Sequence, residues 1–507
     1  MRRFLLGVFS IATMSAGVFM APGCGSDSED DGSSGSSGGN EAGCVGFGCV
    51  NPTDAGQCRS PLECSQQENL QCEGGTKTSL TGIVYDPAGV VPIYNATVYI
   101  PLSNEEPLDP IVEGASACDR CDAKISGKPI AITTTGTDGS FKLDNAPSGA
   151  NIPLVIQIGK WRRKVIVPAA AKCVANTVDK ALSRLPKNST EGHIPRMALA
   201  TGAADPLQCL LRKVGIDDSE FGVAGSAARI HLYAGGGFGA AGSPTQTPTS
   251  KFKAGVNGGA AFPAAGAVWD SLPELQKYDV VLLSCEGDEN IANKPDPSKK
   301  AVYDYAAGGG RVFASHYHYS WFSKSPDPIV SGVASWSPID VGTGFNEREP
   351  PANGNPATTP VNGDISSAFP KAVAMNEWLT KQNALPGGKL PIFDARHNID
   401  NAKPPTSLSW ITVPTTKAGI TPPNTTPVQY LSFNTPIGAA EDKICGRVVV
   451  SDIHVAAQAG ATDSALADFP DGCVTTDLTA QQKALEFMLF DLSSCIQKDD
   501  QPIQGPK

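Results

Sequence analysis

The chain has 507 residues, of which 18% are charged and 40% hydrophobic, and this is long enough for two or three folded domains. Its formal net charge of −11 at pH 7 argues against nucleic acid as a partner, because a phosphate-binding surface needs an excess of Lys and Arg. The 53 glycines and 41 prolines indicate long surface loops and β-rich sections.

The first residues have the features of an export signal. Arg2 and Arg3 precede an apolar stretch at residues 4–20, which is too short and too rich in small residues for a membrane span. The stretch leads into Ala-Pro-Gly-Cys at residues 21–24, which resembles the lipobox of bacterial lipoproteins. The resemblance implies a lipid on Cys24 and a place at the outer membrane or cell surface. A plain secretory signal is the alternative and would give a periplasmic or secreted protein.

The cysteine content agrees with export. Setting Cys24 aside leaves thirteen of the fourteen cysteines, and outside the cytosol such a number predicts disulfides. Thirteen is odd, so at least one thiol stays free or pairs between chains, and we expect this to be Cys285. Cys118 and Cys121 are two residues apart, which predicts a local disulfide or pairing of one of them with Cys173.

Residues 78–168 show the alternating pattern of short strands. The turn at Gly136–Gly139 predicts a hairpin, and the basic segment Lys160–Lys164 predicts a second, solvated hairpin end. The runs TGIVYDPAG at 81–89 and TGTDGSFKLDNAPSG at 135–149 resemble the carboxypeptidase regulatory-like (prealbumin-like) domain. This resemblance implies a Greek-key β-sandwich used for packing or adhesion, without chemistry of its own.

From residue 194 onward the pattern changes to alternating strands and helices. Asp205, followed by proline, predicts a helix N-cap. Apolar β-branched runs predict a parallel sheet. Residues 323–440, rich in Pro, Asn, Thr and Gly, predict a long loop-rich insertion, partly β with isolated strand candidates at 410–413 and 428–433, that closes over the sheet edge. The predicted strands are 194–201, 229–233, 280–284, 311–315 and 446–454, and the predicted helices are 205–214, about 299–306, and 479–493.

Chemically capable side chains follow three of these strands. Cys285 and Glu286 follow the first, His316 and His318 the second, and His454 ends the third. In open α/β sheets, ligands gather outside the carboxyl ends of the strands, so we expect any binding or active site there.

The order of strands and polar residues resembles the class I glutamine amidotransferase-like superfamily, and within it the trehalose-utilisation (ThuA-like) family. In the amidotransferases the central strand runs into an elbow that carries a nucleophilic cysteine. The elbow position here is His316 in Ala-Ser-His-Tyr-His, so thiolate attack on glutamine is not expected. We expect Glu286 and Asp288 to raise the pKa of the Cys285 thiol, which also argues against thiolate chemistry.

Three interpretations of these residues stay open. His316 and His454 could act as a general acid/base pair oriented by Glu286, in a hydrolase or lyase on a carbohydrate-like ligand. The same three residues with His318 and Asp452 could bind a divalent metal. The histidines could also be hydrogen-bonded groups in a non-catalytic protein. We favour the third: a cell-envelope binding or scaffold protein, with carbohydrate or another envelope protein as its ligand.

The predicted fold class is multidomain, with a small all-β Greek-key sandwich and a flavodoxin-like α/β domain that carries a long loop-rich insertion. The predicted segments are a signal peptide at 1–23, a flexible tether at 24–42, a Cys-rich disulfide segment at 43–76, the sandwich at 77–170, a linker at 171–192, the α/β domain at 193–497 with its insertion at about 323–440, and a tail at 498–507.

Overall fold

The computed structural model describes residues 58–115, 118–121, 123–239, 245–337, 360–413, 426–455 and 463–503. All of them belong to one compact unit that begins at Cys58. The predicted signal peptide, Cys24 and the first two cysteines of the Cys-rich segment lie outside the described residues.

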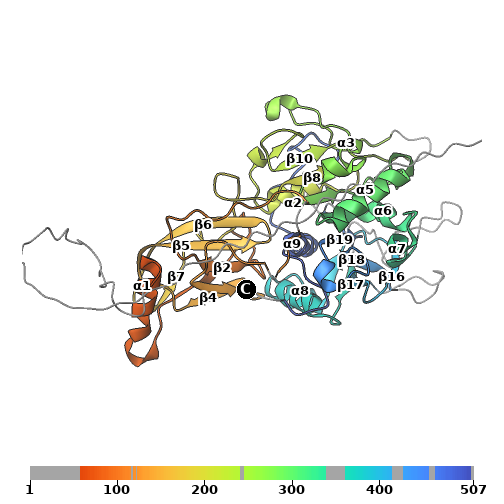
Figure 1. Cartoon of the computed structure of the whole chain (residues 1–507). Helices are drawn as coiled ribbons and strands as arrows, with labels where there is room; N and C mark the ends of the chain where they lie inside the picture. Colours follow the sequence, from red (N-terminus) through yellow and green to blue (C-terminus); the bar gives the residue numbers. More distant parts are fainter. Residues whose placement is uncertain are drawn as a thin grey trace, which may run out of the picture. The chain divides into compact units, whose positions relative to one another are not determined.

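The N-terminal part of this unit consists of two small sheets. One has the strand order β3-β2-β5-β6 and the other the order β4-β1-β7, and Figure 1 shows β2, β5 and β6 side by side. Alternate residues of these strands are buried in a shared apolar core that includes Leu80, Val98 and Leu154. The strands are β1 (Ser79–Ile83), β2 (Thr97–Ile100), β3 (Ala131–Thr134), β4 (Ser140–Asp144), β5 (Gly149–Ile158), β6 (Trp161–Ala170) and β7 (Ala175–Thr177).

The predicted hairpin between β3 and β4 is wrong. The turn itself is present, with the Gly136 N–H donating to the Ser140 carbonyl. However, β3 pairs with β2, and β4 pairs with β1. The turn therefore carries the chain from one sheet to the other. The long hairpin is β5–β6, and its end is not solvated: Trp161 is buried against Phe490, and Lys160 forms an ion pair of 2.6 Å with Asp279.

The second part is built on a ten-stranded mixed sheet with the order β15-β14-β17-β18-β19-β12-β11-β8-β10-β9. Six neighbouring strands are parallel, and five of them begin close to the predicted positions, whereas β9 was not predicted. They are β8 (Met197–Ala200), β9 (Phe221–Gly222), β10 (Ile230–Tyr233), β11 (Val280–Leu283), β12 (Arg311–Ser315) and β19 (Gly446–Ser451). A mixed α/β protein with several sheets is thus confirmed.

The region predicted as a loop-rich insertion supplies strands to this same sheet. They run antiparallel and extend it beyond β19. These strands are β14 (Val361–Ile365), β15 (Leu390–Ile392), β17 (Ser407–Thr412) and β18 (Val428–Thr435), while β13 (Ala334–Trp336) and β16 (Ile399–Ala402) form a separate pair. The insertion is consequently part of the core of the sheet, with β18 almost entirely buried.

Helices cover both faces of the large sheet. Val281 and Val312 share a core with Val302 of α5, whereas Val280 and Phe313 share another with Met488 of α9, so the two helices lie on opposite faces. The helices are α1 (Pro61–Glu68), α2 (Leu207–Lys213), α3 (Gly266–Trp269), α4 (Leu272–Leu275), α5 (Asp296–Ala307), α6 (Ser320–Ser323), α7 (Pro328–Ser331), α8 (Pro370–Lys381) and α9 (Ala480–Ser493). Within the described part of the chain, none of them is long and apolar enough to cross a bilayer.

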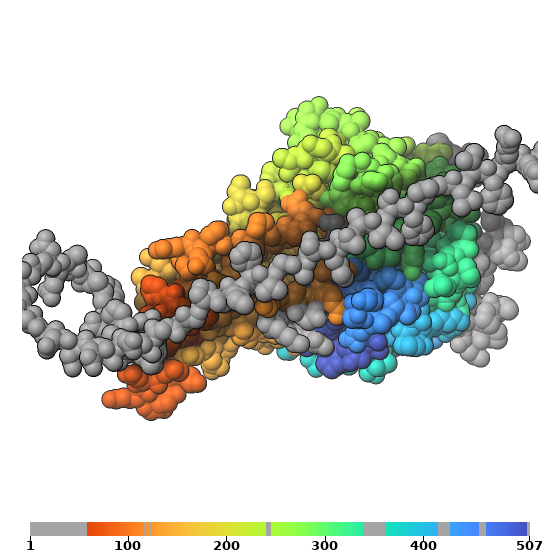
Figure 2. Space-filling view, in the orientation of Figure 1, coloured from red at the N-terminus to blue at the C-terminus, as the bar shows by residue number. Residues whose placement is uncertain are grey.

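Disulfides join the two parts. Cys118 pairs with Cys445 and Cys121 pairs with Cys495, so the predicted local bridge is wrong. Cys173, the alternative partner expected for Cys118 or Cys121, pairs instead with Cys72. Cys72 of the predicted Cys-rich segment therefore forms its bridge to a residue outside that segment. The remaining pairs are Cys58–Cys64 and Cys209–Cys473. In the space-filling view, surface coloured orange from the N-terminal part adjoins surface coloured blue from the C-terminal part (Figure 2).

Candidate functional site

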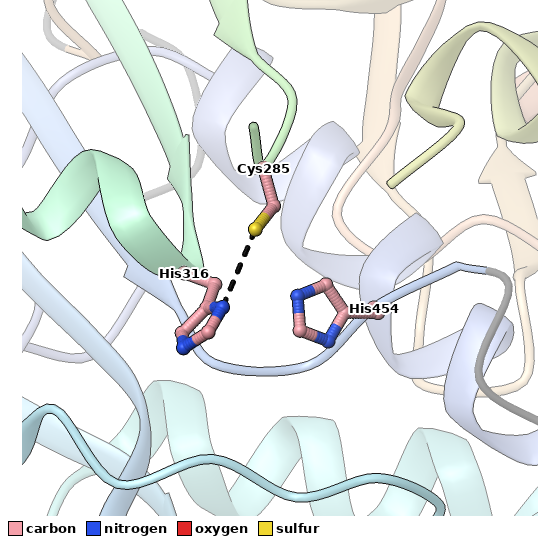
Figure 3. A group of neighbouring side chains, drawn as sticks. All are labelled: Cys285, His316 and His454. Carbon is pink, nitrogen blue, oxygen red and sulfur yellow. Dashed lines mark hydrogen bonds between the residues drawn. The ribbon is translucent and has the colours of Figure 1, made fainter. Parts of the chain in front are cut away.

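Three neighbouring parallel strands, β11, β12 and β19, end at one point of the sheet edge. Cys285 follows β11, His316 follows β12 directly, and His454 follows β19. The Cys285 Sγ lies 3.3 Å from the His316 Nδ1, and the centroids of the two imidazole rings are 5.0 Å apart (Figure 3). One ligand atom from each residue falls within 4.8 Å of the others. The sheet edge thus brings together the two histidines predicted from the sequence and the thiol.

His316 occupies an elbow of the backbone. Its φ angle is +40°, in the left-handed region that residues other than glycine rarely adopt, and a helical turn begins with it immediately after β12. Such strain persists only where the surroundings fix it, and it concentrates at functional positions. The elbow points the His316 imidazole toward Cys285 and His454. The centroid of the Tyr317 ring lies 4.1 Å from the centroid of the His316 ring.

Burial sets the protonation of all three side chains. It raises the pKa of the Cys285 thiol to about 12, with the nearby Asp205 carboxylate adding to the effect. Burial also lowers the pKa of His316 and of His454 well below the ordinary value, and the Arg396 guanidinium acts in the same direction on both. A neutral thiol therefore faces neutral imidazoles at pH 7, the opposite of the thiolate–imidazolium pair that an activated cysteine needs. The carboxylate that raises the thiol pKa is Asp205, not the predicted Glu286 or Asp288.

The segment between β15 and β16 closes the site. The Asn398 backbone N–H donates to the Asp452 carboxylate at 3.1 Å, and the Gln429 side chain donates to the Arg396 carbonyl at 2.6 Å. Cys285 is 0%, His316 1% and His454 3% exposed. The two imidazoles converge, but solvent and substrates do not reach them in this structure.

Glu286 and His318, the other predicted site residues, have different partners. Glu286 forms a buried ion pair of 2.5 Å with Lys294 and accepts a hydrogen bond of 2.7 Å from the Gly236 N–H. The ring nitrogens of His318 lie 2.9 Å from the Ser284 carbonyl oxygen and 2.8 Å from the Trp321 indole nitrogen. These contacts hold the loops after β11 and β12, and neither residue joins the group of three.

Asp205 is a site residue that sequence reasoning assigned to another role. Pro206, not Asp205, occupies the N-cap position of α2. The Asp205 carboxylate instead accepts hydrogen bonds from the Ser315 hydroxyl at 2.5 Å and from the Val455 N–H at 2.8 Å. It thereby fixes the residues next to His316 and His454, and burial raises its pKa to about 7. No local pattern distinguishes such a carboxylate from a helix cap.

Gly202 lets the loop after β8 approach the same point. A Cβ at this position would collide with the backbone carbonyl oxygens of Ser284 and Cys285. The residues that follow β11 are therefore packed directly against the loop that leads to Asp205.

Comparison of the chain with known protein families, with curated proteins and with solved structures found no significant match.

Proposed function

We propose that this protein is an exported, lipid-anchored binding or scaffold protein of the cell envelope, and that its α/β part performs no hydrolysis at the sheet edge. The observation that carries the proposal is the closure of that edge. The thiol and both imidazoles are almost fully buried and electrically neutral, and Glu286, the proposed orienting carboxylate, is held by Lys294. A general acid/base pair needs contact with its substrate, and a nucleophilic cysteine needs its thiolate.

Export is supported by the disulfides. Ten cysteines of the described residues form five bridges, and two of these bridges join parts of the chain more than 300 residues apart, with sequence separations of 327 and 374. Such bridges persist in oxidising surroundings and are rare in the cytosol. Cys285, the predicted free thiol, is the cysteine of the described residues outside any bridge. The lipid on Cys24 completes the proposal and rests on the lipobox resemblance.

Two features support the proposed domain families. The opposed small sheets suit a regulatory-like β-sandwich, and the strand–elbow–helix turn at His316 suits an amidotransferase-like core from which the elbow cysteine has been lost. In this proposal the fold has kept the position of the active site without its nucleophile.

Ligand binding is proposed for a groove away from the sheet edge. It encloses about 690 Å³ between the loop after β1 and the ends of α2 and α9. Charged side chains of both signs line it, including Arg212, Asp217, Asp218 and Lys483. Hydrogen-bonding groups of this kind suit a polar, carbohydrate-like ligand better than an apolar one.

Activity screening tests the absence of hydrolysis. Purified protein is assayed on chromogenic glycosides and on amides beside His316→Ala and His454→Ala. The expected result is the same background rate for all three proteins. Turnover by the wild type that both substitutions abolish would establish the alternative, a hydrolase acting through the two histidines, which converge closely enough for that role.

Lipid labelling tests the anchor separately. Cells expressing the chain are grown with radiolabelled palmitate and fractionated. We expect label in the membrane fraction for the wild type and none for Cys24→Ser. Unlabelled wild-type protein secreted in soluble form would contradict the anchor while leaving export intact.

A further inference from the structure

We propose that Cys285, His316 and His454 form a buried binding site for one d¹⁰ transition-metal ion, zinc(II) or copper(I). This site goes beyond the proposed function, since a binding or scaffold protein does not require it. It also differs from the metal site expected from the sequence, because His318, Glu286 and Asp452 are outside the group and the thiol is inside it.

The ligand set defines the class of ion. A thiolate and two imidazoles are soft to borderline donors, which select zinc and copper over magnesium and calcium. Bonds of about 2.3 Å to sulfur and about 2.0–2.1 Å to nitrogen are normal for zinc. The three ligand atoms already lie within 4.8 Å of one another, so only small inward movements of the side chains are needed. Figure 3 shows the three side chains converging from three separate strand ends.

His454 supplies an independent observation. It is 3% exposed, and neither of its ring nitrogens has a hydrogen-bond partner among the described residues. Leaving a polar group buried without a partner costs the free energy of removing it from water, and native proteins rarely tolerate this without a reason. A metal ion bound to one ring nitrogen removes part of that cost and accounts for the position of the ring beside His316.

The surroundings have the character of a structural metal site. The ligands come from three strand ends, and Asp205 accepts hydrogen bonds from the Ser315 hydroxyl and the Val455 N–H beside two of them. The Arg396–Asn398 segment is bonded to Asp452 and Gln429 next to the site. The three protein ligands would suffice for a trigonal copper(I) ion, whereas on zinc, whose structural sites have four ligands, a bound water would have to complete the tetrahedron. On binding, the Cys285 thiol gives its proton to bulk water and its sulfur bonds to the ion as thiolate, with no change of oxidation state. We expect loading during folding, before the covering segment packs.

Metal analysis of the full-length protein tests the site. The chain is folded in an oxidising compartment supplied with zinc(II), or with copper added and kept as copper(I) by a copper(I)-specific chelator, then extracted, dialysed against a weak chelator and measured by mass spectrometry. We expect one equivalent of zinc or copper per chain in the wild type and a fall to background in Cys285→Ala and in His454→Ala. His193→Gln is the matched control and keeps its metal, because His193 precedes β8, at the opposite end of the parallel strands from the three ligands, and its ring contacts the Lys160 carbonyl and Glu113.

X-ray absorption at the metal edge identifies the atoms bonded to the ion in the wild-type protein. It therefore tests the proposed ligands even where a substituted variant fails to fold. The expected spectrum of the wild type contains one sulfur at about 2.3 Å and two imidazole nitrogens at about 2.0–2.1 Å. Separate loading with each ion distinguishes zinc from copper. A wild type that folds without metal, an ion surrounded by oxygen alone, or metal retained by both folded variants would each overturn the proposal and leave a polar core of one thiol and two imidazoles.

Discussion

Glu286 and Lys294 form an ion pair that is almost completely removed from solvent. The Nζ–Oε2 distance is 2.5 Å, and each side chain is 1% exposed. Burial alone would raise the pKa of Glu286, but His318 and Lys294 together lower it below the ordinary value, so the carboxylate is ionised. The pair fixes the loop that follows β11, and a buried pair of this kind is costly to break from one side only.

We predict that Glu286→Ala lowers the free energy of unfolding by about 3–5 kcal/mol, because Lys294 is left as an uncompensated buried charge. Urea unfolding followed by circular dichroism measures the change. The exposed pair of Lys277 and Glu274, at 57% and 41% exposure, provides the control: Glu274→Ala should cost at most about 1 kcal/mol. Equal losses in the two variants would show that Glu286 is not a buried charge.

Two buried carboxyl groups lie on elements that face each other, and their ionisation lowers the stability of the folded protein. This is opposite to Glu286, which is stabilised in its ionised form. Burial raises the pKa of Asp86, after β1, to about 6, and raises that of Glu486, on α9, well above its ordinary value. Lys180 near Asp86 and Lys483 near Glu486 offset this effect only in part. Because the folded state binds these protons more tightly than the unfolded chain, the stabilisation is complete below pH 4 and is lost as the pH rises through 6.

We predict that Glu486→Gln reduces the loss of stability between pH 5 and pH 8 by about 1–3 kcal/mol, since the amide cannot ionise. Denaturant unfolding at both pH values gives the difference. His318, whose pKa burial lowers to about 4, contributes with the opposite sign, but equally in both proteins. The exposed Glu105→Gln is the control and should follow the wild type at both pH values. Parallel losses in wild type and Glu486→Gln would contradict the prediction.

At the scale of the element, the local sequence pattern predicted those strands and helices whose formation depends mainly on neighbouring residues. The strands β11, β12 and β19 are continuous apolar runs buried on both faces, and α9 begins at a capping box of Thr479 and Gln482, so all of them lie close to the predicted positions. The helix α8 was missed, although its apolar residues recur at helical spacing after a proline at the first turn. The Pro- and Asn-rich composition around it obscured that signal.

Pairing between elements was beyond the reach of the sequence. The same turn chemistry serves a hairpin and a crossing between two sheets, so β3 and β4 could not be assigned to different sheets in advance. At the site, strand order brings Cys285 beside the two histidines, and this order depends on contacts between residues far apart in the chain. The sequence placed Cys285, His316, His318 and His454 at one sheet edge, and convergence of His316 and His454 belonged to two of the three open interpretations; that the thiol lies beside them and His318 does not was not predicted.

The β5–β6 hairpin is the element that joins the N-terminal sheets to the large sheet. Trp161 is fully buried, with its ring 5.7 Å from Phe490 of α9. We predict that Trp161→Ala costs about 3–5 kcal/mol of unfolding free energy through the cavity it leaves. Ile166→Ala, on the same strand but 37% exposed, should cost about 1 kcal/mol or less. Thermal unfolding of both variants compares them, and similar losses would argue against a tightly packed joint at Trp161.

At the scale of the whole unit, covalent bonds and ion pairs hold the two parts together. The bridges Cys118–Cys445 and Cys121–Cys495 attach one loop of the N-terminal part to the start of β19 and to the end of α9. Beside them, Lys160 pairs with Asp279 and Arg229 pairs with Glu113 at 2.7 Å. Cys445 precedes β19 and Asp279 precedes β11, so these attachments lie at the start of the parallel strands, at the edge opposite the one that carries the three-residue site.

We predict that removing the bridge by Cys118→Ser with Cys445→Ser lowers the unfolding free energy by about 2–5 kcal/mol. The neighbouring bridge Cys121–Cys495 still closes the chain, so the loop released is on the order of 50 residues and not the full separation of 327. Cys58→Ser with Cys64→Ser, which opens a separation of 6, is the control and should cost about 1–2 kcal/mol less. Guanidinium unfolding under oxidising conditions measures both. Equal losses would mean that the long-range bridge does not restrict the unfolded chain more than the short one does.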